Sequence, residues 1–409
     1  MGPAPPPEAP RGSRRGHPGV TVRGVPVPVG RWLAEHEDRP SPRLRTETSV
    51  SSSPPRRRVL RTAAAAAVSG LTAPPLLGAA GPARADARPD LAAGSAPGSA
   101  PSGGARVVRA RRTSERIVDL TVRSPALGGT AEVRLLVPDG WDERRPRDRW
   151  PVLWLLPGGN AEHLAFTDDY GLQHEPSVRR VLVVMPSMPF YGFYTDWWNG
   201  GTGGPPAVES FHLRELRPLL ERDYGAGGRR AVAGESQGGY GAVKYAARHP
   251  GMFRAAASYS GFLHPLMYPT AVVHGAEYLG VEWRRIWGDP VRQRHIWEAN
   301  DPYHLARRLR GVRVHIAAGD GTPGRLDPPD VEPDEEVPGF EELARLFPRE
   351  VISLSESIMG DDSRAVAYRL QQEGVRVSTH FFRGTHAPAY WQRELYATLP
   401  MLLGALRGR

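Results

Sequence analysis

The segment that most constrains this chain of 409 residues is Gly234-Glu235-Ser236-Gln237-Gly238. The pattern Gly-x-Ser-x-Gly is typical of a sharp turn from a strand into a helix, in which the serine hydroxyl is held exposed. Glycines flank the serine because a side chain there would obstruct so tight a turn. An apolar run at 230–233 precedes the pattern, and a helix-like run at 240–249 follows it. The sequence therefore predicts that Ser236 lies at a strand-to-helix turn.

Other apolar runs predict the sheet to which this turn belongs. Alternation indicates strands at 116–122 and 131–137, and the continuous apolar run 150–156 is typical of a strand buried on both faces. Further strands are expected at 181–185, 255–260, 312–318 and 375–382, with helices at 207–224 and near 391–403. Strands that alternate with helices predict an α/β-hydrolase fold, with a mostly parallel central sheet and helices on both faces.

A serine hydroxyl is a poor nucleophile unless a base removes its proton, and in this fold the chain order is Ser, acid, His. His386 is the best candidate for the base, because it follows the last expected strand and precedes the final helix. Two backbone N–H groups must stabilise the oxyanion. We expect them from Gln237, directly after the serine, and from Gly159, in the loop after the run 150–156.

The acid is left open by the residues alone. Position favours Asp320, because it directly follows the strand expected at 312–318, where many hydrolases of this fold carry the acid. The acid must orient the imidazole and stabilise its charged form, which any well-placed carboxylate could do.

Four short motifs resemble, in the same order, those of a known family. They are Phe193–Trp198, Trp297–Pro302, Gly319–Pro323, and Gly384–His386 followed by Tyr390-Trp391. The family comprises secreted esterases, including the esterase-D-like hydrolases and the actinobacterial trehalose mycolyltransferases and diacylglycerol acyltransferases. The resemblance covers roughly residues 115–400. It implies a serine esterase or acyltransferase that acts on a small-molecule, lipid or glycan ester and needs no metal or organic cofactor.

The resemblance also bears on the acid and on the substrate. In the mycolyltransferases the position of Asp320 is Asn, and the acid is a Glu that corresponds to Glu356, so the resemblance favours Glu356 over Asp320 as the acid. The family's Asp and Arg that hold the sugar are replaced here by Pro157 and Asn160, and its Trp after the histidine by Pro388. Trehalose is therefore not implied as the acceptor. An alternative is a non-catalytic extracellular binding protein of the same fold, against which the intact Ser, acid and His argue.

The N-terminal region carries most of the net charge. Residues 1–85 contain 13 arginines and 5 acidic residues and so hold most of the formal charge of +9, while the rest of the chain is almost neutral. This distribution argues against a nucleic-acid partner. Arg56-Arg57, an Ala-rich run and Ala83-Arg84-Ala85 predict a twin-arginine signal peptide at 56–85, with export to the cell envelope or the medium.

The remaining segments predict the domain organisation. A disordered extension is expected at 1–55, where a start codon assigned too early would explain the length, and a flexible linker at 86–112. The catalytic domain is expected at 113–405. The signal's apolar run is short and contains two prolines, so we expect no stable membrane insertion after cleavage. With no cysteine in the chain, disulfides and Cys-based metal sites are excluded.

Two segments of the catalytic domain have alternative interpretations. The aromatic residues of 190–198 are expected either to line a sugar or acyl groove or to lie in the core. The Pro-, Asp- and Glu-rich segment 324–342 is expected to be a mobile insertion near the site, or only a solvated loop.

Overall fold

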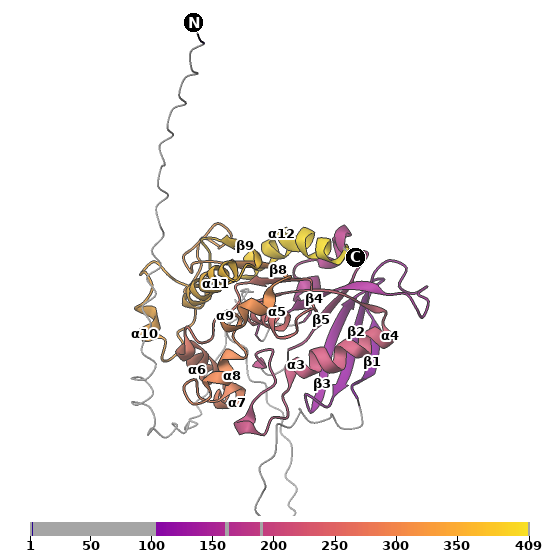
Figure 1. Ribbon diagram of the computed structural model, residues 1–409, viewed down its shortest axis with the longest axis horizontal. Coiled ribbons are helices and arrows are strands. Elements are labelled where there is room, and N and C mark those ends of the chain that lie inside the picture. The colour runs from indigo at the N-terminus through magenta and orange to yellow at the C-terminus, as the bar shows by residue number, and fades with distance from the viewer. Residues whose placement is uncertain (1, 3–103, 160–162, 189–190, 408–409) are drawn as a thin grey trace, which may run out of the picture. The chain divides into compact units, whose positions relative to one another are not determined.

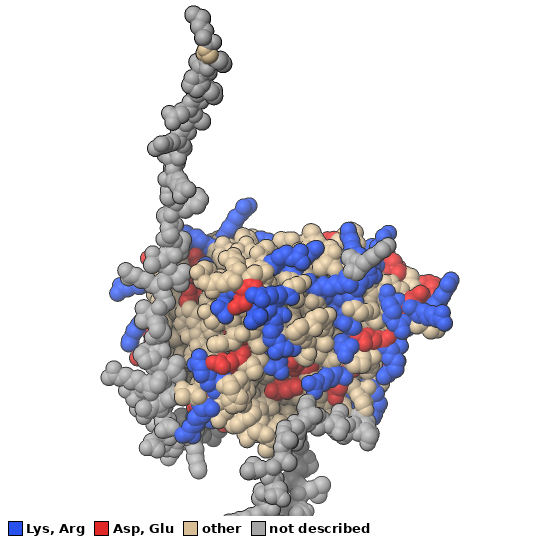
Figure 2. All heavy atoms as spheres, viewed as in Figure 1, with Lys and Arg blue, Asp and Glu red and all other residues tan. Residues whose placement is uncertain are grey.

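The computed structural model describes residue 2 and residues 104–159, 163–188 and 191–407 (Figure 1). Apart from residue 2, the predicted N-terminal extension, the predicted export signal and residues 86–103 of the expected linker lie outside the described residues. None of the helices in the described ranges has the length and the apolar character needed to cross a membrane. Figure 2 shows arginine and acidic side chains interspersed over one face of the protein.

A nine-stranded sheet organises the described residues, in the order β1-β2-β3-β5-β4-β6-β7-β8-β9. The pairs from β1 to β3, and β3 with β5, are antiparallel; all pairs from β5 to β9 are parallel. The strands are β1 (Arg106–Arg112), β2 (Ile117–Ser124), β3 (Gly129–Leu136), β4 (Trp150–Leu156), β5 (Leu182–Pro186), β6 (Ala226–Glu235), β7 (Ala255–Tyr259), β8 (Arg313–Ala318) and β9 (Arg376–Phe381). Strands β2 to β9 correspond to the eight predicted runs, and the predicted α/β fold is confirmed.

Helices connect the strands and cover the sheet (Figure 1). They are α2 (Ala165–Asp168), α3 (Val208–Ser210), a π-helical turn (Phe211–Leu216), α4 (Arg217–Asp223), α5 (Gln237–Arg248), α6 (Pro269–Tyr278), α7 (Arg284–Trp287), α8 (Arg294–Glu298), α9 (Pro302–Leu305), α10 (Glu341–Ala344), α11 (Leu354–Gln372) and α12 (Pro388–Arg407). Short 3₁₀ turns lie at Leu172–His174, Pro176–Val178, Asn199–Gly201 and Ala306–Leu309.

The core shows that both faces of the sheet are covered. The apolar side chains of α12 cluster with alternate residues of the central strands, such as Leu153, Leu155, Ala231 and Ala233. Since successive side chains of a strand point to opposite faces, the intervening residues face the other way. They are buried too, and α5 also contacts β4, β6 and β7. The C-terminal ends of the parallel strands therefore lie along one side of the sheet, between the helical layers that cover its two faces.

The first strand corrects the predicted linker. Residues 106–112, expected to be flexible, form strand β1, which pairs with β2 from Arg106 opposite Arg123 to Arg112 opposite Val118. Most side chains of β1 are exposed. The strand is held by backbone hydrogen bonds and not by a buried face, so its sequence has no apolar alternation from which to predict it.

Candidate active site

Ser236 lies at the predicted turn between β6 and α5. Its backbone has φ 51° and ψ −125°, a conformation unusual for a residue other than glycine. The turn is too crowded for larger neighbours: a Cβ at Gly238 would lie 1.9 Å from the carbonyl oxygen of Leu156, and one at Gly234 2.3 Å from that of Gly238. The Ser236 N–H donates to the carbonyl of Tyr259 at 2.8 Å, which ties the turn to β7.

A chain of hydrogen bonds links Ser236 to a histidine and a glutamate. The distance between Ser236 Oγ and His386 Nε2 is 3.0 Å, and that between His386 Nδ1 and Glu356 Oε2 is 2.6 Å. His386 lies in the loop between β9 and α12, and its ring packs edge-on against Trp391, with centroids 4.7 Å apart. The structure thus brings together three residues that the sequence places up to 150 positions apart.

Glu356, in the first turn of α11, is fully buried and its carboxylate has several donors. Oε1 accepts hydrogen bonds from Ser260 Oγ at 2.7 Å and from the N–H of Gly319, while Oε2 faces His386. Asp320 is used differently. Its Oδ1 accepts hydrogen bonds from the N–H and the hydroxyl of Thr322, at 2.9 and 2.6 Å, as in an Asx turn. Of the two candidate acids, the structure therefore brings Glu356 to the histidine.

The surroundings of His386 favour its protonated form. Burial lowers the pKa of the imidazole, but the hydrogen bond and the charge of Glu356 outweigh burial, so the pKa of His386 is raised above its ordinary value. The carboxylates of Asp334 and Glu235 act in the same direction. An imidazole in this position is well suited to accept a proton from a serine hydroxyl and to carry the resulting charge.

The two residues predicted to hold an oxyanion lie against each other. A Cβ at Gly159 would be 2.8 Å from Nε2 of Gln237, so the loop after β4 passes directly over the start of α5. Gln237 is the first residue of α5, and its N–H therefore belongs to the unpaired donors of a helix N-terminus. Asn160, one of the positions that differ from the mycolyltransferases, is outside the described residues.

The sequence analysis missed a buried carboxyl beside the serine. Glu235 is 1% exposed, and its Oε2 accepts a hydrogen bond from Tyr170 Oη at 2.7 Å. The backbone N–H of Gly158 faces the same carboxylate and favours its charged form. Burial, only partly offset by these donors, raises the pKa of Glu235 to about 7. The signal was available, since a glutamate ends the otherwise apolar run that leads into Ser236.

The segment 324–342, expected as a mobile insertion, is tied to the site by two aspartates that the sequence analysis did not single out. Asp327 accepts hydrogen bonds from Thr385 Oγ1, beside His386, and from Tyr390 Oη. Asp334 accepts hydrogen bonds from Ser353 Oγ at 3.0 Å and Ser355 Oγ at 2.6 Å, at the start of the helix that carries Glu356. The segment therefore braces the histidine loop and the glutamate helix together.

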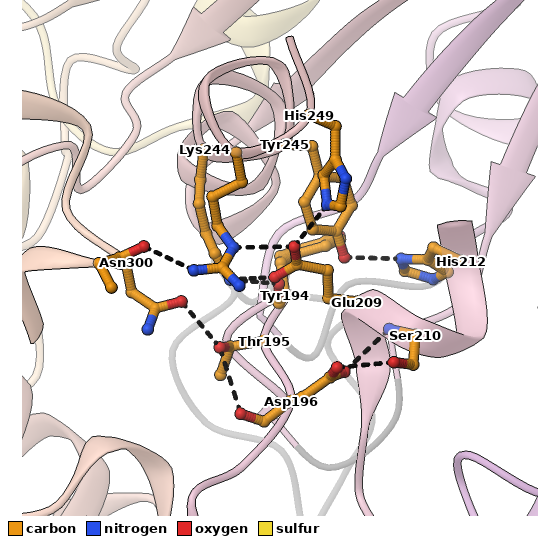
Figure 3. A network of polar contacts seen from close by, with 12 residues as sticks. Tyr194, Thr195, Asp196, Glu209, Ser210, His212, Lys244, Tyr245, His249 and Asn300 are labelled. Carbon is orange, nitrogen blue, oxygen red and sulfur yellow. Dashed lines mark hydrogen bonds and ion pairs between the residues drawn. The ribbon is translucent and has the colours of Figure 1, made fainter. Parts of the chain in front are cut away.

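Three basic side chains from the C-terminal part of α5 and the residue after it surround the carboxylate of Glu209 (Figure 3). Its carboxylate lies 2.9 Å from Lys244 Nζ, 2.9 Å from Arg248 Nε and 2.6 Å from His249 Nε2. Lys244, fully buried, also donates to the carbonyl of Tyr194 at 2.8 Å. The network thereby fixes the predicted aromatic segment.

Three aromatic residues of that segment, Phe193, Tyr194 and Trp197, are at most 8% exposed and so lie in the core. Tyr191 and Trp198 are half-buried, and Phe190 lies outside the described residues. The alternative in which these aromatics are ordinary core residues therefore holds for the buried three.

One cluster among the described residues has the composition of a metal site: His264, Asp301 and His304 have potential ligand atoms within 4.8 Å of one another. Both carboxylate oxygens of Asp301 accept hydrogen bonds from within the chain. Its Oδ1 caps α9 through the N–H of Tyr303, and its Oδ2 accepts from His264 Nδ1 at 2.7 Å and the N–H of Leu266 at 3.1 Å. These contacts give the cluster a role in holding the loop after β7.

Comparisons with known proteins identify the family of this chain. The family model described as "Putative esterase" matches residues 124–402. Esterase Rv1288 of Mycobacterium tuberculosis is 31% identical over 224 residues, which cover 53% of this chain and 48% of that protein. The diacylglycerol acyltransferase/mycolyltransferase Ag85B of Mycolicibacterium smegmatis is 30% identical over 231 residues, covering 54% and 66%. The chain thus spans about half the length of the first of these relatives.

Solved structures show the same fold. The crystal structure of Mycobacterium tuberculosis MPT51 superposes with a TM-score of 0.53 at 25% identity, covering 70% of this chain and 98% of that one. A ferulic acid esterase superposes with a TM-score of 0.51 at 18% identity, covering 71% and 98%, which speaks for the fold alone. Because the family model spans well over half of the sequence, this chain belongs to the esterase family that the sequence motifs resemble.

Proposed function

We propose that this chain is an exported serine esterase or acyltransferase that forms an acyl-enzyme on Ser236. The observation that carries the proposal is the hydrogen-bonded chain from Ser236 Oγ through His386 to the buried carboxylate of Glu356. Nucleophile, base and orienting acid are the three parts that activated-serine chemistry requires. Membership of the esterase family supports the same reaction class.

The proposed reaction proceeds in two transfers. His386 Nε2 takes the proton of Ser236 while Oγ attacks the ester carbonyl, and the negative oxygen is held by the N–H groups of Gly159 and Gln237. The carbon–oxygen bond of the ester then breaks, and the leaving alcohol takes the proton from His386. Glu356 stabilises the imidazolium throughout. Water or a second alcohol, deprotonated by His386, finally attacks the acyl-enzyme; the bond from the acyl carbon to Ser236 Oγ breaks, and His386 returns the proton to Oγ.

Esterase and transferase differ only in the acceptor of this last step. We propose a small-molecule, lipid or glycan ester as the substrate, and the steps above need no metal or organic cofactor. Pro157 and Asn160 replace the side chains that the resemblance associates with holding the sugar. Pro388, which replaces the family's Trp, begins α12, where proline is well accommodated.

The test uses the protein from Asp86 onward, incubated with acyl nitrophenyl esters in the presence and absence of trehalose and glycerol. We expect hydrolysis and covalent labelling of Ser236 by a fluorophosphonate, and a loss of about 10⁴-fold or more in Ser236→Ala. A labelled peptide without Ser236, or full activity in the variant, would favour the non-catalytic binding protein.

The export proposal has its own test. Replacing Arg56 and Arg57 by lysine should leave the precursor inside the cell, because the twin-arginine pair is the recognised part of such a signal. N-terminal sequencing should find Asp86 as the first residue of the exported protein. Unchanged amounts of mature protein outside the cell would rule out this route.

A further inference from the structure

The peptide group that joins Pro157 to Gly158 is held at both of its polar ends. Its carbonyl oxygen accepts a hydrogen bond from Tyr194 Oη at 2.5 Å, and its N–H faces the buried carboxylate of Glu235, whose charged form it favours. The two holding residues come from different parts of the chain. Glu235 precedes the nucleophile, whereas Tyr194 lies in the aromatic segment and is anchored through its own carbonyl by Lys244.

This peptide determines where the next N–H points. Gly158 and Gly159 have no side chains, so their backbone is free to adopt many conformations and is not fixed by local sterics. An oxyanion donor must be aimed in advance, since its value lies in needing no reorganisation during the reaction. Fixing the plane of the Pro157–Gly158 peptide restricts the rotation that sets the direction of the Gly159 N–H.

The surroundings of Glu235 indicate that its carboxyl is held in place. Tyr170, which donates to it, is itself fixed because its carbonyl accepts from Tyr396 Oη at 2.7 Å and Gln392 Nε2 at 3.3 Å, both on α12. Burying a carboxyl is costly unless hydrogen bonds compensate. An apolar side chain would fill this position without that cost, but it could not hold the N–H of Gly158.

We propose that Glu235 is a positioning residue that, together with Tyr194, clamps the Pro157–Gly158 peptide and so aims the Gly159 N–H at the oxyanion. This inference rests on the proposed function, because it takes Gly159 as an oxyanion donor and Ser236 as the nucleophile. It assigns to Glu235 an effect on the transition state and none on the affinity for the ground-state ester.

The central experiment compares Glu235→Leu with Glu235→Gln on a nitrophenyl ester. Leucine removes the acceptor, so we expect kcat to fall about 10- to 100-fold with KM changed less than about threefold, below the full loss of an oxyanion donor. Glutamine can still accept from Gly158 and donate to Tyr170, and should restore most of the loss. Asp169→Asn, at an exposed carboxylate next to Tyr170, is the matched control and should behave as the parent.

A pH profile gives a readout that simple loss of stability would not move. The groups that face Glu235 are Tyr170, Asp169, His386, Tyr194 and Tyr259. The charge of Glu235 raises the pKa of His386, and catalysis requires neutral His386. Both Glu235 variants should therefore move the acid limb of kcat/KM to lower pH, whereas Asp169→Asn should leave it in place.

Tyr194→Phe tests the other end of the clamp and also serves if Glu235→Leu does not fold. It should lower kcat several-fold, and the double variant should lose less than the product of the single losses, since both residues hold one peptide. Parental kcat in folded Glu235→Leu or in Tyr194→Phe, or an equal loss in the leucine and glutamine variants, would overturn the inference. Absence of fluorophosphonate labelling in the parent protein would instead overturn the proposed function.

Discussion

Two buried glutamates lie near the two ends of helix α5, and their surroundings are opposite. Glu209, near the C-terminal end, lies against Lys244, Arg248 and His249; these outweigh the effect of burial, and the pKa of Glu209 is lowered. Glu235, just before the N-terminal end, accepts a hydrogen bond from a tyrosine hydroxyl and faces a backbone N–H, with no lysine or arginine beside it among the described residues, and burial raises its pKa to about 7. The same side chain is thus held as an ion at one end and near neutrality at the other.

The difference distinguishes a buried carboxylate that holds helices together from a buried carboxyl that belongs to the proposed active site. A buried carboxylate surrounded by cations fastens elements together, and at Glu209 it fastens α3 to α5 and, through Lys244, to the aromatic segment. Carboxyls with strongly raised pKa values gather at functional sites, where their protonation can matter to the chemistry. Glu356 is a third case, in which the main ionic partner is the proposed catalytic histidine itself.

The largest effect is expected where a carboxylate faces His386. Glu356→Gln should lower kcat by about 10² to 10⁴, because an amide can hold the imidazole in the wrong tautomer and cannot stabilise its charge. Asp320→Asn, the matched control, should stay within about tenfold, since Asp320 contacts Thr322 and not the histidine. Circular dichroism must first show both variants folded. The reverse order of losses would assign the acid to Asp320.

The network at Glu209 should act on stability. Lys244→Met leaves a buried carboxylate with one cation fewer, and the free energy of unfolding should fall by about 3 kcal/mol. Urea unfolding at neutral pH measures it. The double variant Lys244→Met/Glu209→Gln should recover part of the loss, because no uncompensated charge remains. If Lys244→Met alone lowered the free energy of unfolding by less than about 1 kcal/mol, the network would not hold these elements together as inferred.

Glu235 should have the opposite effect on stability, and only in a pH window. Its pKa in the folded protein, about 7, is above the ordinary 4.5, so between these values the folded state binds more protons and stability falls as pH rises. Removing the group in Glu235→Gln should leave the variant increasingly more stable than the parent from pH 5 to pH 8, by about 1 to 3 kcal/mol. A pH-independent difference in urea unfolding would contradict the raised pKa.

The smallest effect is expected at an exposed ion pair. Arg294 and Glu298, one turn apart on α8, lie 2.9 Å from each other in solvent. Glu298→Ala should change the free energy of unfolding by at most about 0.5 kcal/mol, and added salt should reduce the difference further. A loss comparable with that of Lys244→Met would show that burial is not what distinguishes the Glu209 network.

The fold could be predicted from the sequence where a residue pattern is compatible with only one local structure. The strand-like run before Ser236 and the helix-like run after it together predicted the strand-to-helix turn. The eight runs that form β2 to β9 were long and apolar enough to be recognised as strands. Strand β1 escaped because its side chains are mostly exposed and its pairing depends on the backbone. Asp320 and Glu356 could not be separated by position, because the distinction depends on how α11 packs against β8 and the histidine loop.

The supporting residues were harder still to find. Asp327, Asp334 and Tyr170 act through contacts with residues 19 or more positions away, and no short pattern marks such partners. Glu235 was visible as a charge in an apolar run, but its role required the loop at Gly158 to be placed beside it. Residues that do chemistry could be proposed from motifs, whereas those that position them required the three-dimensional arrangement.

Lys244 has a practical consequence beyond its ion pair. It is the sole lysine in the sequence, and its side chain is fully enclosed. Amine-directed reagents therefore find no surface side chain to modify, and coupling to this amine requires the helix α5 region to open. Acylation of Lys244 by an activated ester, followed by mass spectrometry, would report the opening rate of the core around α5, the helix that follows the proposed nucleophile, without any engineered probe.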